Sequence, residues 1–295
     1  MVKKTLFISI VLFLVYNLLL HYIDFPVKPG HQWQENLIKA EDYVYIKNKS
    51  KSVIVGSSLS ALLVDDLLPK SSFNLSFAGH SAFDGLEIIK RTGSSPEVVY
   101  IETNFIFRQA DKGLLNRVFM PVRYSLKKIF PALMEKNQPV CLFNSVIFWM
   151  LSNLKKNLIP AKIDEVISKQ PVREDTKKLL LDILIKDYSS PPDQAIVKKN
   201  KYKLKKYKDY LEKKGSRVIL FEMPIDERLI NLNLFVRARK TIEDVFSPDK
   251  YATIQSPDIK KYNTTDGLHL DRQSVMSYTT FLSSEIKRHS THKKI

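Results

Sequence analysis

The sequence predicts an α/β fold in which helices cover both faces of a parallel sheet. The observations behind this are four short apolar runs, "SVIVGSS", "FNLSFAG", "VVYIETN" and "RVILFEMP", which begin at residues 52, 73, 98 and 217. Each run ends in a small or polar residue or in proline, and helical stretches separate the runs. Near-continuous apolar strands that alternate with helices are typical of a parallel sheet buried on both faces. A weaker fifth strand, "YATIQSP", begins at residue 251.

The first segment predicts a membrane anchor over residues 1–25. Lys3 and Lys4 precede an uncharged apolar run from Thr5 to about Ile23, which approaches the ~20 residues that span a bilayer. A cleaved signal peptide has a shorter apolar core and a small-x-small site, and no such site follows this run. A buried core helix is disfavoured because the segment has no polar face. The two lysines predict a cytoplasmic N-terminus, with the rest of the chain on the outer or periplasmic side.

Composition limits the classes of partner. The chain has 295 residues, 44% of them hydrophobic and 26% charged, as in globular proteins, and a formal charge of +16. Such an excess favours nucleic acid, acidic lipid or acidic polysaccharide, and export removes nucleic acid from this set. The single cysteine, Cys141, excludes an intrachain disulfide and a C-x-x-C site. There is no metal-ligand constellation and no glycine-rich phosphate loop, so neither metal nor cofactor is expected.

Two further segments complete the predicted organisation. Residues 26–50, polar and punctuated by proline and glycine, indicate a stalk with one short helix. The main domain is expected over residues 51–290. More than a hundred residues separate its third and fourth strands, too many for a simple crossover, so a helical insertion is expected over about 110–190. Its mixture of aromatic and basic residues fits either helices packed on the domain or contact with a membrane surface.

Polar residues at the predicted strand ends are the candidate site, because ligands of open parallel sheets bind at the carboxyl ends of the strands. The motifs there are "GSS", "AGHS", "ETN" and "TTDGLHLD". Hydrolysis by a serine nucleophile also needs a base, usually histidine, and a group that orients this base. Four of the six histidines lie in the anchor, the stalk or the tail, which leaves His80 and His269. Asp266 precedes His269 by three residues, with Gly267 allowing a tight turn, so its carboxylate could orient the ring towards a serine.

These motifs resemble the four sequence blocks of the SGNH (GDSL-type) hydrolases, in the same order. The resemblance implies the flavodoxin-like fold of that superfamily and matches Ser58 to the nucleophile. It matches Asp266 and His269 to the other triad members. For the oxyanion hole it implies the Ser58 N–H, the Gly79 N–H and the side-chain amide of Asn104.

Departures from the family pattern occur beside two of these positions. Ser57 replaces the usual aspartate, a change that is familiar among anchored envelope members. Glu102 and Phe105 replace the usual glycine and aspartate around Asn104, which bears on how that side chain is aimed.

Three residues near these blocks have two interpretations each. Ser57, His80 and Glu222 are candidate substrate-lining residues. Alternatively, Ser57 caps a helix, His80 belongs to a turn, and Glu222 is simply paired. Ser57 is also the alternative nucleophile if the alignment of the first block is shifted.

The resemblance is nearest to anchored SGNH proteins that work beside membrane-bound O-acyltransferases, as in alginate acetylation or teichoic-acid D-alanylation. It implies transfer or hydrolysis of O-acyl groups, acetyl above all, on a cell-envelope polysaccharide through a serine acyl-enzyme. The expected partners are the glycan, the membrane through the N-terminal helix, and a membrane-bound O-acyltransferase. The alternative is a non-catalytic binding or scaffold subunit of an envelope-polymer modification or export complex.

Overall fold

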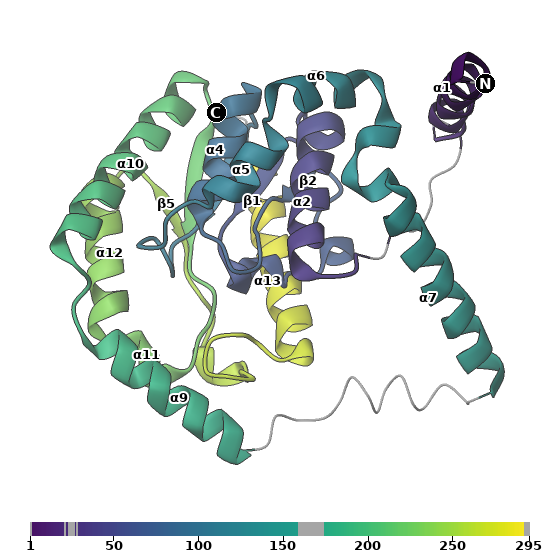
Figure 1. The fold of residues 1–295 in the computed structure, drawn as a ribbon. Helices are drawn as coiled ribbons and strands as arrows, with labels where there is room; N and C mark the ends of the chain where they lie inside the picture. Colours follow the sequence, from purple (N-terminus) through teal and green to yellow (C-terminus); the bar gives the residue numbers. More distant parts are fainter. Residues whose placement is uncertain (1, 21, 23–26, 28, 159–173, 292–295) are drawn as a thin grey trace. The chain divides into compact units, whose positions relative to one another are not determined.

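The computed structural model describes residues 2–20, 22, 27, 29–158 and 174–291 (Figure 1). By its internal contacts the chain divides into two compact units: residues 1–46 with 112–170, and residues 47–111 with 171–295. The predicted boundary between anchor and stalk, at residues 25 and 26, lies outside the described residues. So does the stretch 159–173 of the expected insertion.

The second unit contains a five-stranded, all-parallel sheet flanked by helices, which confirms the predicted α/β class. The strands run in the order β2-β1-β3-β4-β5, the order of flavodoxin-like folds. Their bounds are β1 Ser52–Val55, β2 Ser72–Asn74, β3 Val98–Glu102, β4 Arg217–Phe221 and β5 Ala252–Ile254. All five strands predicted from the apolar runs are present, including the weak fifth one.

Helices cover both faces of this sheet (Figure 1). Their bounds are α3 Ser58–Ala61, α4 Ala82–Thr92, α9 Glu174–Ser189, α10 Gln194–Lys213, α11 Glu227–Ile230, α12 Asn233–Val245 and α13 Arg272–Thr291. On one face, Tyr100 and Phe221 belong to the same buried cluster as Leu282 of α13. On the other, α4 approaches β1 so closely that a Cβ on Gly85 would lie 2.6 Å from Val55 Cγ1. Burial on both faces explains why the strands are apolar without alternation.

The first unit is helical and joins segments from two parts of the chain. It contains α1 Val2–Leu19, α2 Gln32–Asp42, α5 Lys112–Val118, α6 Pro121–Ile129 and α7 Pro139–Leu158. Leu37 and Ala40 of α2, in the segment expected to be a stalk, are buried. An ion pair between Glu41 and Lys127 is also buried and ties α2 to α6 of the insertion. Among the described residues, α1 is the one helix long and apolar enough to span a membrane.

Candidate active site

The structure brings together three side chains that are far apart in the sequence. His269 Nε2 lies 3.0 Å from Ser58 Oγ, and His269 Nδ1 lies 2.7 Å from Asp266 Oδ2. Both distances are those of hydrogen bonds. Ser58 follows β1, whereas the other two follow β5, and the sheet brings these strand ends to the same edge. The arrangement is that of a nucleophile, a base and a group that orients the base.

A short closed loop holds Asp266 and His269. Thr264 and Leu270 form an isolated antiparallel bridge across its base. Gly267 has φ +94°, a backbone conformation that glycine adopts without the strain a Cβ would cause. Asp266 Oδ1 accepts hydrogen bonds from the backbone N–H groups of the second and third residues after it, at 2.9 and 2.7 Å. The carboxylate therefore fixes the turn as well as the ring, and its contact with the ring is the one expected from the three-residue spacing.

The charge of Asp266 assigns the protons on the ring. Partial burial alone would raise the pKa of this carboxyl. Hydrogen bonds from the His269 ring and from two backbone N–H groups outweigh burial and lower the pKa of Asp266 to about 2. An ionised carboxylate only accepts, so the neutral ring carries its proton on Nδ1. His269 Nε2 is then the acceptor that faces the Ser58 hydroxyl.

Ser58 is placed by a tight turn between β1 and α3. Ser57 caps α3, because its Oγ accepts from Leu59 N at 3.2 Å. Before it, Gly56 lies against the side chains beneath the turn. A Cβ there would meet Ser60 Oγ at 2.1 Å and Glu102 Oε2 at 2.6 Å. The glycine that ends the apolar run is thus required by this close approach.

Beneath the turn lies a carboxyl group that the sequence motifs did not single out as functional. Glu102, at the end of β3, is 1% exposed and accepts hydrogen bonds from the Ser57 N–H at 2.7 Å and the Ser57 hydroxyl at 2.8 Å. It also accepts from the Ser60 hydroxyl at 2.7 Å. Burial raises its pKa, and these hydrogen bonds oppose the rise. The sequence signal for this residue was an acidic side chain at the end of an apolar strand, although the sequence does not show which turn it faces.

The same contacts decide between the two interpretations of Ser57. The residue is 1% exposed, and its hydroxyl bonds to Glu102 and caps α3. The structure therefore corrects the prediction that Ser57 lines a substrate site. With Ser58 Oγ on the histidine, Ser57 is not in position to act as the nucleophile either.

Asn104 and Gly79, the two further candidates for an oxyanion hole, lie in different settings. The Asn104 side chain is paired with the backbone after β4: its Nδ2 donates to Met223 O at 3.0 Å, and its Oδ1 accepts from Met223 N at 2.8 Å. One of its two amide hydrogens is therefore engaged. Gly79 lies in the turn between β2 and α4, with φ +79°. Their roles towards an oxyanion stay predictions.

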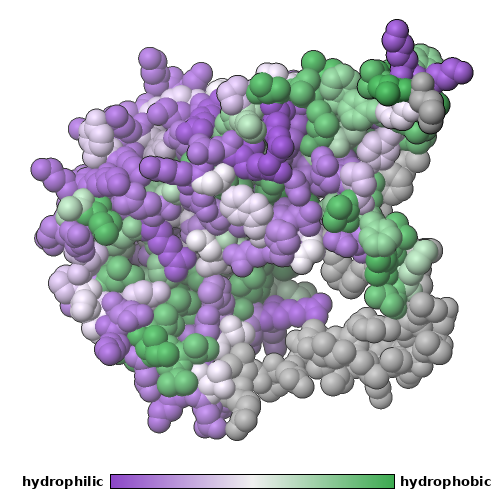
Figure 2. Space-filling view, viewed as in Figure 1, coloured by the Kyte–Doolittle hydropathy of each residue, from purple (hydrophilic) through white to green (hydrophobic). Residues whose placement is uncertain are grey.

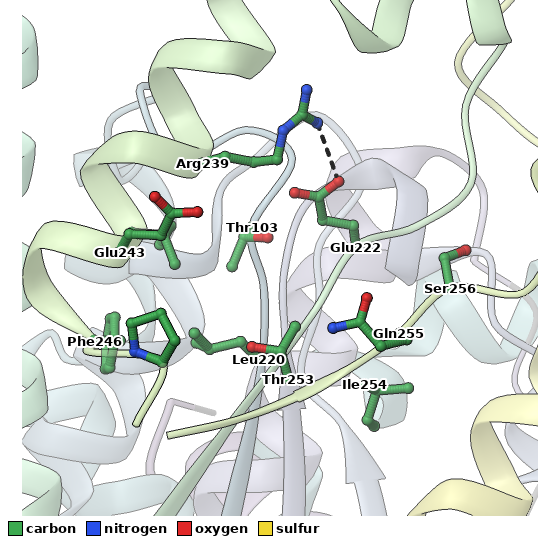
Figure 3. A pocket seen from close by; sticks show the side chains of 12 residues that line it. Thr103, Leu220, Glu222, Arg239, Glu243, Phe246, Thr253, Ile254, Gln255 and Ser256 are labelled. Atoms are coloured by element: carbon green, nitrogen blue, oxygen red, sulfur yellow. Dashed lines mark hydrogen bonds and ion pairs between the residues drawn. The ribbon is translucent and has the colours of Figure 1, made fainter. Parts of the chain in front are cut away.

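Glu222, the second candidate substrate-lining residue, lines a cavity of about 430 Å³ over the ends of β4 and β5. Figure 3 shows its carboxylate facing Arg239 of α12, at an Nη1–Oε2 distance of 3.4 Å. Burial raises the pKa of Glu222, while the guanidinium lowers it. Glu222 is thus both paired and accessible from a cavity, and Thr103, next to Asn104 in sequence, lines the same cavity.

His80, the third candidate, is 8% exposed. Its Nδ1 lies 3.4 Å from Asp84 Oδ1 of α4, and its Nε2 lies 3.9 Å from Asp111 Oδ2. Within the described part of the unit, no hydrogen bond joins it to Ser58 or His269. Its surroundings are those of a turn residue at the start of a helix.

Compared with known proteins, the chain matches no family model, no curated protein and no solved structure. The assignment of this site therefore depends on its geometry alone. In the part of the chain that the structure describes, no three His, Cys, Asp or Glu side chains gather as metal ligands.

Proposed function

We propose that this protein is an exported, membrane-anchored enzyme of the SGNH type that acts on O-acyl groups of a cell-envelope polysaccharide. Its acyl group would be acetyl. One observation carries the proposal: the 3.0 Å contact between Ser58 Oγ and an imidazole nitrogen whose partner nitrogen is held by an ionised carboxylate. A serine nucleophile needs this chain of hydrogen bonds, from serine to histidine to carboxylate, for its activation.

In the proposed reaction, Ser58 Oγ attacks the acyl carbonyl carbon while His269 Nε2 takes its proton. The bond from that carbon to the donor oxygen then breaks, and His269 returns the proton to the leaving alkoxide. Water, or a sugar hydroxyl, attacks the resulting ester with His269 again as base, and Ser58 Oγ leaves with the proton. Asp266 stays ionised throughout and stabilises the imidazolium.

The negative oxygen of each tetrahedral intermediate needs nearby donors. The proposal assigns the Ser58 N–H, the Gly79 N–H and the free amide hydrogen of Asn104 to this role. One such donor is typically worth about 2.7–4 kcal/mol in the transition state. Because Met223 anchors the Asn104 amide at both ends, its remaining hydrogen has a fixed direction.

The proposed location follows from α1. With Lys3 and Lys4 in the cytoplasm, α1 spans the inner membrane and the sheet unit lies in the periplasm or outside the cell. Tethering at the membrane favours transfer over free hydrolysis, because a multi-span O-acyltransferase could deliver the acyl group there. The positive charge of the chain suits an acidic polysaccharide acceptor.

A serine-reactive probe tests this proposal on the full chain in detergent. A fluorophosphonate should label wild type on the Ser58 peptide, and an aryl acetate should release acetate. Ser58→Ala should abolish both, while Ser284→Ala, which changes an exposed serine of α13, should leave both unchanged. The proposed activity would be refuted if folded wild type reacts with neither compound, or if the Ser58→Ala variant is as active as wild type.

The second candidate function is a non-catalytic binding or scaffold subunit of an envelope-polymer complex. It is favoured by Asn104, whose amide is engaged with Met223, and by the unusual Glu102 and Phe105 beside it. This candidate predicts that glycan or partner binding survives Ser58→Ala combined with His269→Ala. Loss of polymer acylation in a Ser58→Ala strain with normal protein level would exclude it.

A further inference from the structure

The helix α7 carries a stripe of apolar side chains that are exposed in the part of the chain that the structure describes. Its exposed apolar side chains, among those described, are Val140, Phe143, Val146, Ile147, Met150 and Leu151. At ~100° per residue they fall within an arc of about 140°. Cys141 and Ser145, on the opposite side of the helix, are buried. Figure 2 shows hydrophobic side chains gathered over α7.

Exposure of this kind is unusual for a surface in water. Phe143 is 64% exposed and Met150 is 52% exposed. A contiguous stripe of large apolar side chains marks contact with a partner or a membrane. We therefore expect a partner or a membrane to cover the outer face of α7.

Contacts within the same unit place the start of α7 beside the anchor. Asn17 Oδ1, near the end of α1, accepts from Ala132 N at 3.0 Å, and Tyr16 OH donates to Asn137 O at 2.6 Å. Phe13 packs on Phe130 with ring centroids 5.4 Å apart. Because these α1 residues belong to its last turns, the segment that leads into α7 lies at the level where the anchor leaves the bilayer.

The length and charge pattern of α7 distinguish lying on a membrane from crossing it. No charged side chain occurs between Pro139 and Leu154, a stretch of about 24 Å at ~1.5 Å per residue. The hydrocarbon core is about 30 Å thick. The stretch also contains Asn144 and Ser145 and is followed by Lys155 and Lys156. A short apolar stripe with a basic end is typical of an interfacial helix.

A second helix of the unit, α6, also has an exposed apolar side flanked by basic residues. In α6, Val122 and Ile129 are 69% and 66% exposed and lie on one side of the helix with Leu126. Arg123 and Lys128 flank this side and are exposed too. Basic residues beside an apolar stripe suit the anionic headgroups of a membrane surface.

We infer that α7, together with α6, lies in the headgroup region of the bilayer that α1 spans, with the stripe Val140–Leu151 facing the lipid acyl chains. The sheet unit is then tethered by an anchor and an interfacial insertion rather than by a free stalk. The inference rests on α1 as an anchor and not on the acyl-transfer chemistry. It can therefore fail while the proposed function holds, and the reverse.

Lipid-borne quenchers test this on the full chain in vesicles of phosphatidylethanolamine and phosphatidylglycerol. Cys141→Ser removes the only cysteine, after which single cysteines replace Phe143, Ile147 or Met150 and carry an environment-sensitive fluorophore. The matched control is Lys205→Cys, an exposed position on α10. Three separate positions protect the test against one variant that fails to fold.

We expect blue-shifted emission at the three α7 positions and its loss when the lipids carry spin labels, with neither effect at Lys205→Cys. Emission at α7 like that of the control would show that the stripe faces water, which overturns the inference. Blue-shifted emission that spin-labelled lipids do not quench would mean that protein covers the stripe. That result also overturns the assignment to lipid.

Discussion

Removal of the Glu102 carboxyl is expected to loosen the turn that presents Ser58. The carboxyl is the shared acceptor for the Ser57 N–H, the Ser57 hydroxyl and the Ser60 hydroxyl. It touches neither Ser58 Oγ nor His269 by any hydrogen bond in the described structure. Glu102 thus acts through Ser57 as a positioning residue for the neighbouring nucleophile.

These contacts allow an estimate of the free energy of unfolding that Glu102→Ala would lose. The two hydroxyls can rotate, and the Ser60 hydroxyl already has Ser76 Oγ at 2.9 Å as another partner. The Ser57 N–H cannot rotate, and an orphaned buried donor costs about 1–3 kcal/mol. Loss of one buried methylene adds about 0.8 kcal/mol. Relief from burying the carboxyl offsets part of this, which leaves roughly 1–3 kcal/mol by the same estimates.

Thermal unfolding of the full chain in detergent measures this difference. A loss of about 2 kcal/mol corresponds to a fall in Tm of roughly 4–8 °C for a domain of this size. Glu102→Gln keeps one acceptor oxygen for the Ser57 N–H, so it should lose only about 1 kcal/mol. Glu227→Gln, on an exposed residue of α11, is the matched control and should leave Tm unchanged.

Two readouts separate positioning from simple stability. Because burial raises the pKa of Glu102, its contribution to stability is fully present below the unfolded pKa and is lost as pH rises through the folded pKa. The Tm deficit of Glu102→Gln should therefore shrink as the pH rises above the ordinary range of a glutamate carboxyl. At fixed temperature below both midpoints, Glu102→Ala should slow fluorophosphonate labelling of Ser58 by about 10²-fold if the turn shifts by ~1 Å.

Three results would refute this reasoning. One is a Glu102→Ala protein with unchanged Tm, which would show that the turn does not depend on the carboxyl. Another is a deficit that grows with pH, which would mean that the pKa of Glu102 is lowered and not raised. The third is wild-type labelling of Ser58 in a variant that has lost stability, which would confine Glu102 to a structural role.

Three further predictions concern the same edge of the sheet. Asp266→Asn should lower aryl-acetate turnover by roughly 10³–10⁴-fold, because the amide no longer holds the His269 tautomer; turnover within tenfold of wild type would contradict that role. Gly56→Ala should abolish labelling and lower Tm, since its Cβ would meet Glu102 Oε2 at 2.6 Å; an unchanged Tm would contradict the close approach. Asn104→Ala should lower kcat by about 10²–10³-fold with little change in KM if its amide serves the oxyanion. A fall in Tm with unchanged kcat would assign it to backbone pairing alone.

The strands and the Asp266–His269 pair could be predicted because each depends on local pattern or on elimination, whereas the choice of Ser58 as nucleophile depended on the resemblance of its motif to the SGNH hydrolases. An apolar run closed by a polar residue identifies a buried parallel strand, as at Val98–Glu102. The histidine was found because few histidines remain outside the anchor, stalk and tail. Its partner, Asp266, was found because a carboxylate and a ring three residues apart can meet across a glycine turn.

Contacts between segments far apart in the sequence could not be predicted in this way. Glu102 meets Ser57 across 45 residues of sequence, and no periodicity encodes which strand end will face which turn. The pairing of Glu41 with Lys127, which joins the expected stalk to the insertion, is of the same kind. Such pairs are specified by the packed fold, so a single sequence shows the charged residues but not their partners.

The two carboxyl groups of the site show why their roles cannot be exchanged. Asp266 lies in a partly exposed loop where ring and backbone donors lower its pKa to about 2, so it is ionised at neutral pH. Glu102 is fully enclosed, and burial raises its pKa. A charge on the loop carboxylate stabilises a neighbouring imidazolium, whereas the enclosed carboxyl accepts from donors of the turn that presents Ser58. Orientation of the base therefore belongs to Asp266 and presentation of the nucleophile to Glu102. The two variants should fail in different ways: Glu102→Ala in stability and labelling together, and Asp266→Asn in labelling and turnover with a smaller loss of stability.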